Sequence, residues 1–503
     1  MMDFILAFQW VFIFYFLGIN TAYLTLNYIS IFSIISYMRD HRAEYLPNSL
    51  VEYQPPVSII VPAFNEQGSI VSSVRSLLSL KYPEFEIVVV NDGSTDGTLE
   101  AVIAAFEMVE FPEAYRRRIE TEPVIRIFAS SRFPHVRLLD KVNGGKSDAL
   151  NAGINCIRYP LFCAIDADCI LQEDSLGRAI RPFLEDPSTV AVGGVVRVIN
   201  GCSVRNGLLE KVGLPKNLLA NFQLVEYLRA FLFGRLGWTP MNALLIISGA
   251  FGVFYKERVI AVGGYRNDTV GEDMDLVVRL HRSMREDGRR YRISFVPDPI
   301  CWTEAPEDLK SLKNQRMRWQ RGVAESLTDN WGLMFNRRGG AVGWVAFPFM
   351  LIFEFIGPAI EVLGYAFMIP LWWFDLIPLT SFLVFMFVSV GMGMLLSTNA
   401  LFLEEISFQM YPRIRQQIKL FLIAILENFG YRQINSVWRV MAMVKWIFSF
   451  GKKSSWGHME RGGSWQQAHG KIEVKPSQSK NNAEPRIKSS HVDVITPESA
   501  GTS

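Results

Sequence analysis

Two long apolar stretches constrain this chain most, because each is long enough to cross a lipid bilayer. The first covers residues 4–38, with Asp3 before it and Arg39 after it, and the second covers residues 341–450. About twenty apolar residues suffice for one crossing. The residues between the two stretches have the composition of a soluble protein. The sequence therefore predicts membrane regions on both sides of one soluble domain.

The first stretch predicts an uncleaved N-terminal anchor over residues 1–40. It is too long for a signal peptide and lacks the basic start of one. Arginines follow it and none precede it, which places the soluble domain, residues 50–335, in the cytoplasm. The five cysteines show no zinc-like spacing, which indicates reduced thiols.

The second stretch, residues 340–450, predicts C-terminal membrane helices. We expect two crossings, over residues 341–374 and 377–402. Residues 420–450 are apolar but carry Glu427, Arg432, Arg439 and Lys445, so a further crossing and an interfacial amphipathic helix both remain open. Residues 451–503 have almost no large apolar side chains, which predicts a disordered tail.

The soluble domain alternates short apolar runs with helical segments, which predicts an α/β fold with a mostly parallel sheet. The runs at 57–61, 87–90 and 161–165 read as buried strands. The polar segments PAFNE, NDGSTDGT and DAD follow them directly. Since open α/β sheets bind ligands beyond the carboxyl ends of their strands, these segments predict a binding site.

Asp166 and Asp168 flank one small residue at the end of the third strand. Alternation points both side chains the same way, which suits a hard divalent cation, Mg²⁺ or Mn²⁺. Such a triplet is also a common surface turn. Its position at a strand end favours the metal site.

Asp92 and Lys146 suit the recognition of a nucleotide. Asp92 lies at the end of the second strand, although Asp is also an ordinary turn residue. Lys146 offers a point charge to a diphosphate, beside two glycines that permit close backbone approach. An ATPase phosphate loop is excluded because Asp140 occupies the position of its first glycine.

Asp273 lies with Glu272 and Asp275 at the start of a predicted helix. Capping of the helix dipole would explain one such carboxylate, and a general base would explain Asp273. Further along, Gln315, Arg318 and Trp319 lie just before the second apolar stretch. A Trp there is often only an interface anchor.

Together these motifs resemble the processive family-2 glycosyltransferases, which include cellulose, chitin, hyaluronan and poly-N-acetylglucosamine synthases. The resemblance covers roughly residues 55–400. It implies a GT-A type domain that binds a nucleotide-sugar. Asp273 would be the catalytic base, in a GED motif whose glycine replaces the family's threonine, and Gln315, Arg318 and Trp319 complete the family's QxxRW signature.

The resemblance implies roles for a further set of residues. The nucleotide-sugar would be bound by Pro62, Ala63, Asn65, Glu66, Asp92, Lys146, Asp166, Gln315, Arg318 and Trp319. The acceptor would contact Glu272 and Trp319, and the metal would contact Asp168 and Asp166.

The implied function is inverting transfer from UDP-GlcNAc or UDP-Glc to a growing β-linked glycan, in the bacterial cell envelope. The enzyme would be a multi-pass protein of the inner (plasma) membrane that contacts lipid, is coupled to export and has an accessory subunit. The net charge of +2 does not indicate the strongly positive surface that nucleic-acid binding requires. Transfer of a single sugar to a lipid acceptor, and an inactive transporter or scaffold, remain alternatives.

Residues 200–245 form an unusually apolar and aromatic segment for a loop. Two roles remain equally open for it: shaping the acceptor site at the membrane face, or only docking the domain to its helices. Glu354 and Glu361 lie inside or beside the apolar helices, where carboxylates are costly and often functional. An interfacial position would explain them as well.

Overall fold

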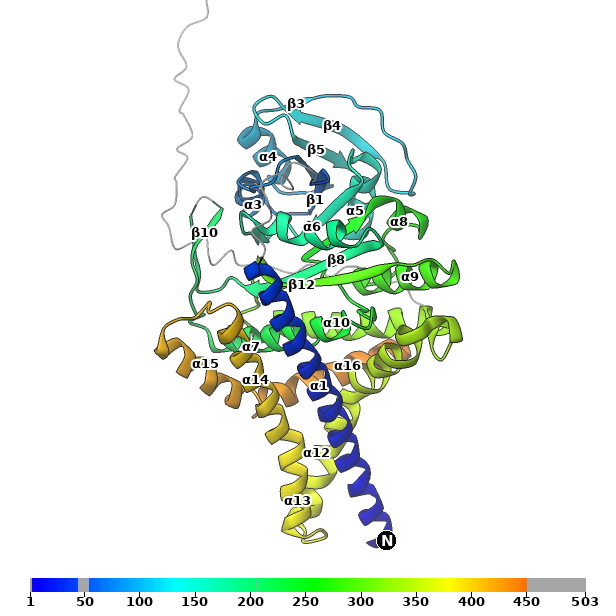
Figure 1. Ribbon diagram of the computed structural model, residues 1–503, viewed down its shortest axis with the longest axis vertical. Coiled ribbons are helices and arrows are strands. Elements are labelled where there is room, and N and C mark those ends of the chain that lie inside the picture. Colours follow the sequence, from blue (N-terminus) through cyan, green and yellow to red (C-terminus); the bar gives the residue numbers. More distant parts are fainter. Residues whose placement is uncertain (1, 44–53, 206, 450–503) are drawn as a thin grey trace, which may run out of the picture.

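The computed structural model describes residues 2–43, 54–205 and 207–449. An α/β domain forms the upper part of the molecule, and long helices descend from it as a stalk (Figure 1). The predicted tail, residues 451–503, lies outside the described residues.

Ten strands form one sheet in the order β3-β4-β5-β2-β1-β6-β11-β8-β12-β7, and two more form a hairpin. The pairs β5-β2, β2-β1, β1-β6 and β8-β12 are parallel. The other pairs, including those of β11, are antiparallel. The strands are β1 Val57–Ala63, β2 Phe85–Asp92, β3 Met108–Glu110, β4 Val124–Ser130, β5 Val136–Lys141, β6 Leu161–Ile165, β7 Ile170–Leu171, β8 Thr189–Val198, β9 Ser203–Arg205, β10 Leu208–Lys211, β11 Phe251–Tyr255 and β12 Arg292–Thr303.

Helices cover the sheet and continue into the stalk. The α-helices are α1 Met2–Ala43, α3 Ile70–Leu78, α4 Thr98–Phe106, α5 Lys146–Cys156, α6 Ser175–Glu185, α7 Leu218–Leu232, α8 Lys256–Ala261, α9 Glu272–Glu286, α10 Leu309–Asp329, α11 Phe347–Phe349, α12 Gly357–Trp373, α13 Leu379–Met386, α14 Met392–Ser407, α15 Ile414–Leu426 and α16 Tyr431–Phe448. Short 3₁₀ turns lie at Leu236–Trp238, Trp331–Leu333 and Arg337–Gly339, and π-helical turns at Val342–Ala346, Met350–Phe355 and Phe387–Gly391.

The three predicted strands are β1, β2 and β6, and the predicted α/β architecture is confirmed. Their apolar runs are buried on both faces, as expected for central parallel strands between helices. Since β1 pairs with both β2 and β6 in parallel, the three strands end at one edge of the sheet. The polar segments that follow them are thereby brought together.

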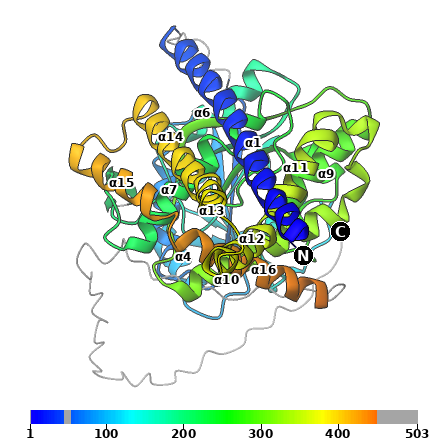
Figure 2. The same cartoon turned by 90° about the horizontal axis from the view of Figure 1, so that it is seen from below.

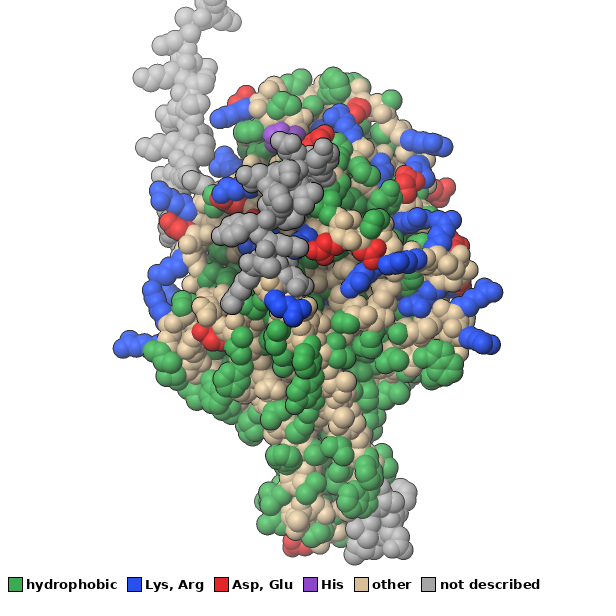
Figure 3. All heavy atoms as spheres, in the orientation of Figure 1, with side chains coloured by type: hydrophobic (Ala, Val, Ile, Leu, Met, Phe, Trp, Pro, Cys, Tyr) green, Lys and Arg blue, Asp and Glu red, His purple; other side chains and the backbone are tan. Residues whose placement is uncertain are grey.

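Three segments are long and apolar enough to cross a membrane: Phe8–Arg39, Val342–Trp373 and Leu379–Ser407. They match the predicted anchor and the two predicted C-terminal crossings. The stalk helices lie side by side in both views (Figures 1 and 2), and α1 contacts α12, α13 and α14. Hydrophobic side chains dominate the stalk surface in Figure 3, whereas charged side chains gather on the upper domain.

The region left open by the sequence, residues 420–450, contains most of α15 and the whole of α16. Neither helix is among the candidate membrane spans found in the described residues. In Figure 1, α16 lies across the stalk at the base of the α/β domain, and it packs on α10 and α12. This arrangement favours the interfacial alternative over a further crossing.

The α/β domain is joined to the stalk by one buried and one partly buried ion pair. Arg197 of β8 pairs with Glu404 of α14, and Arg229 of α7 pairs with Glu427 at the end of α15. Breaking a buried pair leaves an uncompensated charge, which is strongly destabilising. These contacts therefore fix the domain above the stalk.

His281 of α9 provides a pH-dependent element of stability. Its ring is fully buried between the Tyr291 hydroxyl, 2.7 Å away, and the Leu244 carbonyl oxygen, 2.8 Å away. Burial lowers its pKa from 6.5 to about 3. The unfolded chain therefore takes up a proton at a higher pH than the folded chain does, so stability falls as the pH falls from 6.5 towards 3.

We expect acidification from pH 7 to pH 5 to lower the free energy of unfolding of the wild type by about 2 kcal/mol more than that of His281→Gln, since each pH unit below the pKa of the unfolded chain is worth about 1.4 kcal/mol. Glutamine can keep a hydrogen bond to the Tyr291 hydroxyl or to the Leu244 carbonyl oxygen, and it does not titrate. Thermal unfolding of both proteins in detergent at the two pH values measures the difference. Parallel pH dependence of the two would contradict this role.

Candidate active site

One cavity of about 2920 Å³ runs from the strand ends of the α/β domain to the stalk. Its upper wall includes all the residues predicted to bind the donor, the metal and the acceptor, together with Asp273. Its lower wall includes Tyr15, Phe16, Tyr23, Glu354, Glu361, Arg432 and Arg439 from α1, the C-terminal spans and α16. The structure thus brings the whole predicted site together in a space that continues between the stalk helices.

Asp92 ends β2 with its carboxylate engaged by the chain itself. It pairs with Lys141 Nζ at 2.6 Å and accepts the amides of Gly144 at 3.0 Å and Gly145 at 2.7 Å. Lys141 is fully buried and also contacts Asp148 at 2.6 Å. Asp92 therefore holds the glycine loop in front of α5, and it lines the cavity at that position.

The PAFNE segment is tied to the loop that follows β2. Asn65 adopts a positive φ of 56°, which asparagine tolerates better than most residues. Its side-chain oxygen accepts the Thr95 amide at 2.8 Å. The carboxylate of Glu66 accepts the Ser69 hydroxyl at 2.5 Å. Pro62 and Ala63 end β1, so the four predicted residues form one rim of the cavity.

Asp166 and Asp168 both line the cavity beyond β6, and Asp168 is the more buried of the two. Within the described residues, no group of three or more His, Cys, Asp or Glu side chains is arranged around a metal position. The pair nevertheless fits a metal that is shared with a substrate. Mg²⁺ is commonly held by one or two carboxylates together with the phosphates of a nucleotide.

Lys146, the first residue of α5, lies between acidic side chains. Its Nζ is 2.6 Å from Asp166 Oδ1 and 3.4 Å from Glu272 Oε1. Burial opposes its charge, but Asp166 and then Glu272 outweigh burial and raise the pKa of Lys146. Burial raises the pKa of Glu272, although Lys146 acts in the opposite direction. Lys146 thus links Asp166 to the start of α9.

Asp273 is held by two backbone amides. Its Oδ2 accepts the Gly249 N–H at 3.0 Å and its Oδ1 accepts the Met274 N–H at 2.8 Å. The helix predicted at this point is α9, which begins at Glu272. Each carboxylate oxygen retains a lone pair for a further bond. Asp273 is therefore fixed in the cavity with capacity to accept a proton.

Close packing explains why glycine occupies the first position of the GED motif. A Cβ on Gly271 would lie 2.7 Å from the Cα of Gly322 on α10. That distance leaves no room for a side chain, so threonine does not fit at 271. The close approach brings the start of α9 against the helix that carries Gln315, Arg318 and Trp319.

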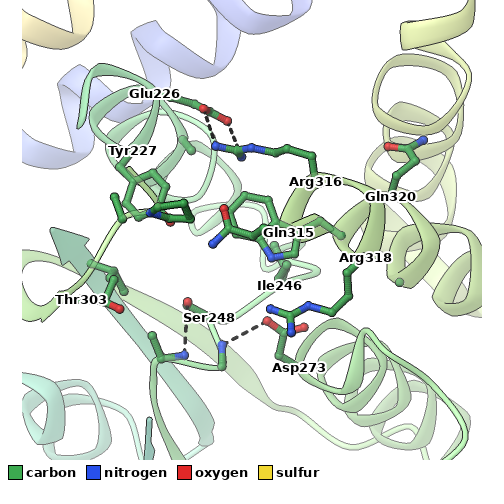
Figure 4. Close-up of a pocket in the computed structure, with 18 of the residues that line it drawn as sticks. Glu226, Tyr227, Ile246, Ser248, Asp273, Thr303, Gln315, Arg316, Arg318 and Gln320 are labelled. Carbon is green, nitrogen blue, oxygen red and sulfur yellow. Dashed lines mark hydrogen bonds and ion pairs between the residues drawn. The ribbon is translucent and has the colours of Figure 1, made fainter. Parts of the chain in front are cut away.

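Helix α10 presents Gln315, Arg318 and Trp319 differently, and Figure 4 labels the first two. Gln315 is buried, and its Oε1 has no hydrogen-bond partner within the described residues. Arg318 points towards Asp273 in the figure. Trp319 is 42% exposed, and the Arg316 guanidinium lies 4.5 Å from its ring centre. Arg316 in turn forms two bonds to Glu226, at 2.7 and 2.8 Å.

Sequence reasoning missed Arg235, which also lines the cavity. Its guanidinium stacks 3.9 Å from the ring centre of Phe231, and Nη1 is buried with no partner within the described residues. Burial lowers its pKa to about 10, against the attraction of Asp273. In the sequence, Arg235 is marked only as one of the charged residues inside the apolar segment 200–245.

That segment docks the α/β domain to its helices and also lines the cavity, while its part in shaping an acceptor site stays a prediction. Helix α7 packs against α14 and α15, and the segment also contributes Asn217, Tyr227, Ala230, Trp238 and other residues to the cavity wall. Glu354 and Glu361 line the lower cavity. Glu354 lies 3.1 Å from Arg439, and Glu361 lies 3.3 Å from Arg432. All five cysteines are free and buried, as expected of reduced thiols.

The chain matches two family models: glycosyl transferase family 2 over residues 58–234, and glycosyl transferase family group 2 over residues 161–389. The poly-beta-1,6-N-acetyl-D-glucosamine synthase of Staphylococcus aureus (strain MSSA476) is 30% identical over 312 residues, which cover 61% of this chain and 63% of the relative. That of Staphylococcus epidermidis is 29% identical, covering 56% and 58%.

The chain thus matches less than two thirds of the length of these relatives. Among solved structures, the mannosyltransferase PcManGT from Pyrobaculum calidifontis, in complex with GDP-Man and Mn²⁺, aligns with a TM-score of 0.44 and 18% identity. The alignment covers 86% of this chain and 99% of that one.

The strand-end carboxylates, the parallel strands that carry them and the family models define a glycosyltransferase with a GT-A type domain. Residues 58–234 and 161–389 carry matches to glycosyltransferase family-2 models, and the chain resembles the poly-N-acetylglucosamine synthases.

Proposed function

We propose that this protein transfers sugars from a UDP-sugar, UDP-GlcNAc or UDP-Glc, to a growing β-linked glycan, with inversion at the anomeric carbon. One observation carries the proposal. A single cavity joins the strand-end carboxylates and Asp273 to polar groups between the membrane helices. A soluble acceptor would need no such continuation.

The donor would lie along the upper rim of the cavity. Pro62, Ala63, Asn65, Glu66 and the segment held by Asp92 form a preorganised edge for the uridine. Lys146 lies beside Asp166, where its ammonium would meet the negative charge of the diphosphate. Because these side chains are already fixed by their neighbours, binding orders little of the protein.

Asp166 and Asp168 would hold Mg²⁺ or Mn²⁺ together with the diphosphate oxygens. Two protein carboxylates supply hard oxygen ligands, which is the donor set that either ion accepts. When bound, the ion supplies Lewis-acid stabilisation of the charge on the departing diphosphate.

Asp273 would remove the proton from the acceptor hydroxyl. The hydroxyl oxygen then bonds to the anomeric carbon while the bond from that carbon to the diphosphate oxygen breaks, and in-line attack converts an α-linked donor to a β-linkage. The Gly249 and Met274 amides hold the carboxylate in place for this step. Glu272, Trp319 and Arg235, which line the same cavity, would contact the acceptor.

The lower cavity would conduct the product towards the membrane. Its charged side chains are paired, as with Arg439 and Glu354 or Arg432 and Glu361. Paired groups offer hydrogen bonds to sugar hydroxyls without an uncompensated charge. This role would place the α/β domain in the cytoplasm of a multi-pass protein of the inner membrane, where an accessory subunit could complete the exit.

The donor can be tested with the full-length protein in nanodiscs containing manganese or magnesium. We expect a UDP-sugar to release UDP, and GDP-mannose to release no GDP. Release from GDP-mannose alone would contradict the UDP-sugar assignment. An absence of release from any nucleotide-sugar would favour the inactive scaffold.

Gln315→Leu tests the side chain on α10 whose Oε1 has no hydrogen-bond partner within the described residues. We expect the KM for the donor to rise about tenfold, the value of one lost hydrogen bond to a buried group, with the melting temperature little changed. Gln320 provides the contrast. Its amide already contacts the Phe355 carbonyl oxygen at 3.0 Å and Arg439 at 2.6 Å, so Gln320→Leu should lower the melting temperature. An unchanged KM in Gln315→Leu would remove it from the donor site.

A further inference from the structure

A second pocket, separate from the active-site cavity, lies where α15 meets the β9-β10 hairpin. Its volume is about 440 Å³. Residues 201, 203 and 211–214 line one side, and residues 413, 415, 416 and 419 line the other. Four of the lining side chains are cationic, namely Lys211, Arg413, Arg415 and Lys419, and none is acidic.

In the part of the chain that the structure describes, no carboxylate neutralises these four cations. Within the described residues, none of them forms an ion pair. Lys419 donates to the Pro215 carbonyl oxygen at 3.0 Å, which fixes α15 against the segment before α7. Elsewhere the ion pairs of this chain join Arg or Lys to a nearby carboxylate. Four unpaired cations around one pocket therefore create a positive potential that attracts an anion.

The pocket floor is built by two backbone segments in close contact. A Cβ on Gly201 would lie 2.3 Å from the Leu214 carbonyl oxygen, and one on Gly213 would lie 2.3 Å from the Gly201 carbonyl oxygen. Gly201 also has a positive φ of 85°. The floor is thus a preformed feature of the fold.

The outer face of α15 indicates where this pocket lies relative to the bilayer. Ile414, Ile418, Phe421 and Leu422 are between 44% and 66% exposed and recur at the spacing of one helix face. The opposite face, with Leu420 and Ile423, is buried against its neighbours. The candidate span Leu379–Ser407 ends seven residues before α15 begins.

An apolar helix face beside a cationic cluster is the pattern of an interfacial helix that meets lipid headgroups. Figure 1 shows α15 at the junction between the α/β domain and the stalk, and Figure 3 shows Lys and Arg side chains on that flank above a hydrophobic surface. We propose that this pocket binds the phosphate headgroup of an anionic phospholipid, with the outer face of α15 in contact with its acyl chains.

The test uses the full-length protein in a neutral detergent, titrated with phosphatidylglycerol or phosphatidylcholine and followed by native mass spectrometry. We expect the wild type to bind phosphatidylglycerol at least tenfold more tightly than phosphatidylcholine. Each basic residue near a membrane surface is worth about fivefold in affinity, so Arg413→Gln/Arg415→Gln should weaken phosphatidylglycerol binding on the order of 10- to 30-fold. Both arginines are exposed, so the variant should fold.

Arg337→Gln/Arg338→Gln is the matched control, because these arginines also flank a candidate span but do not line the pocket. Lys211→Gln, on a different element, should weaken binding about fivefold. Equal losses in the control and pocket variants would overturn the proposal, since they would indicate only general surface charge. So would equal affinity for the two lipids, or full displacement of phosphatidylglycerol by millimolar glycerol phosphate, which would indicate a site for a soluble phosphate.

Discussion

Asp273→Asn is expected to reduce kcat by 10²- to 10⁴-fold, the usual contribution of a general base. The substitution removes the basic oxygen but keeps an oxygen that can accept the Gly249 or Met274 amide, so the start of α9 should remain in place. Donor affinity should change little. Single-turnover measurement of UDP release, with donor binding measured separately, distinguishes these effects.

Asp287→Asn is the control for this variant, since Asp287 lies at the opposite end of α9 and is exposed. It should retain wild-type turnover. If Asp273→Asn kept more than about a tenth of the wild-type rate, Asp273 would not be the base. Glu272 would then be the next candidate, because it is adjacent and lines the same cavity.

Asp168→Asn is expected to lower turnover by roughly 10²- to 10³-fold, because Lewis-acid stabilisation of a leaving group is worth several kcal/mol. The variant should also need a higher manganese concentration for half-maximal UDP release. Asp174→Asn is a suitable control, since Asp174 lies nearby in sequence but contacts Arg178 at the surface. An unchanged metal requirement, or full activity of the wild type in excess chelator, would contradict the metal assignment.

The sequence predicts the backbone of this site well because strand ends are encoded locally. Three apolar runs became β1, β2 and β6, and their parallel pairing placed Asp92 and Asp166 at one edge. The helix at Glu272 and the three apolar spans were likewise predicted from local pattern.

The contacts between distant segments could not be predicted in the same way. Lys146 was expected to meet a diphosphate, and nothing in the local pattern indicates its contacts with Asp166 and Glu272. The ion pair of Arg197 with Glu404 joins residues 207 positions apart. Arg235 belongs to no sequence motif. Its place in the cavity depends on the packing of α7 and of the turn that follows α7.

The departure from the family's threonine illustrates the same limit. In the sequence alone, Gly271 is an unexplained difference from the family's motif, which has threonine at this position. In the structure, it is the point where α9 and α10 come into contact through Gly322. The substitution therefore reflects how closely α9 lies against the helix of the QxxRW signature.

The length of the product tests the central claim most directly. Full-length protein in nanodiscs, supplied with manganese and the accepted UDP-sugar, should form β-linked chains of many sugars, resolved by mass spectrometry and anomeric coupling in NMR. Asp273→Asn should form none. If the wild type instead made only a glycolipid carrying one sugar, the protein would be a single-transfer enzyme and the account of a polymerising cavity would be wrong.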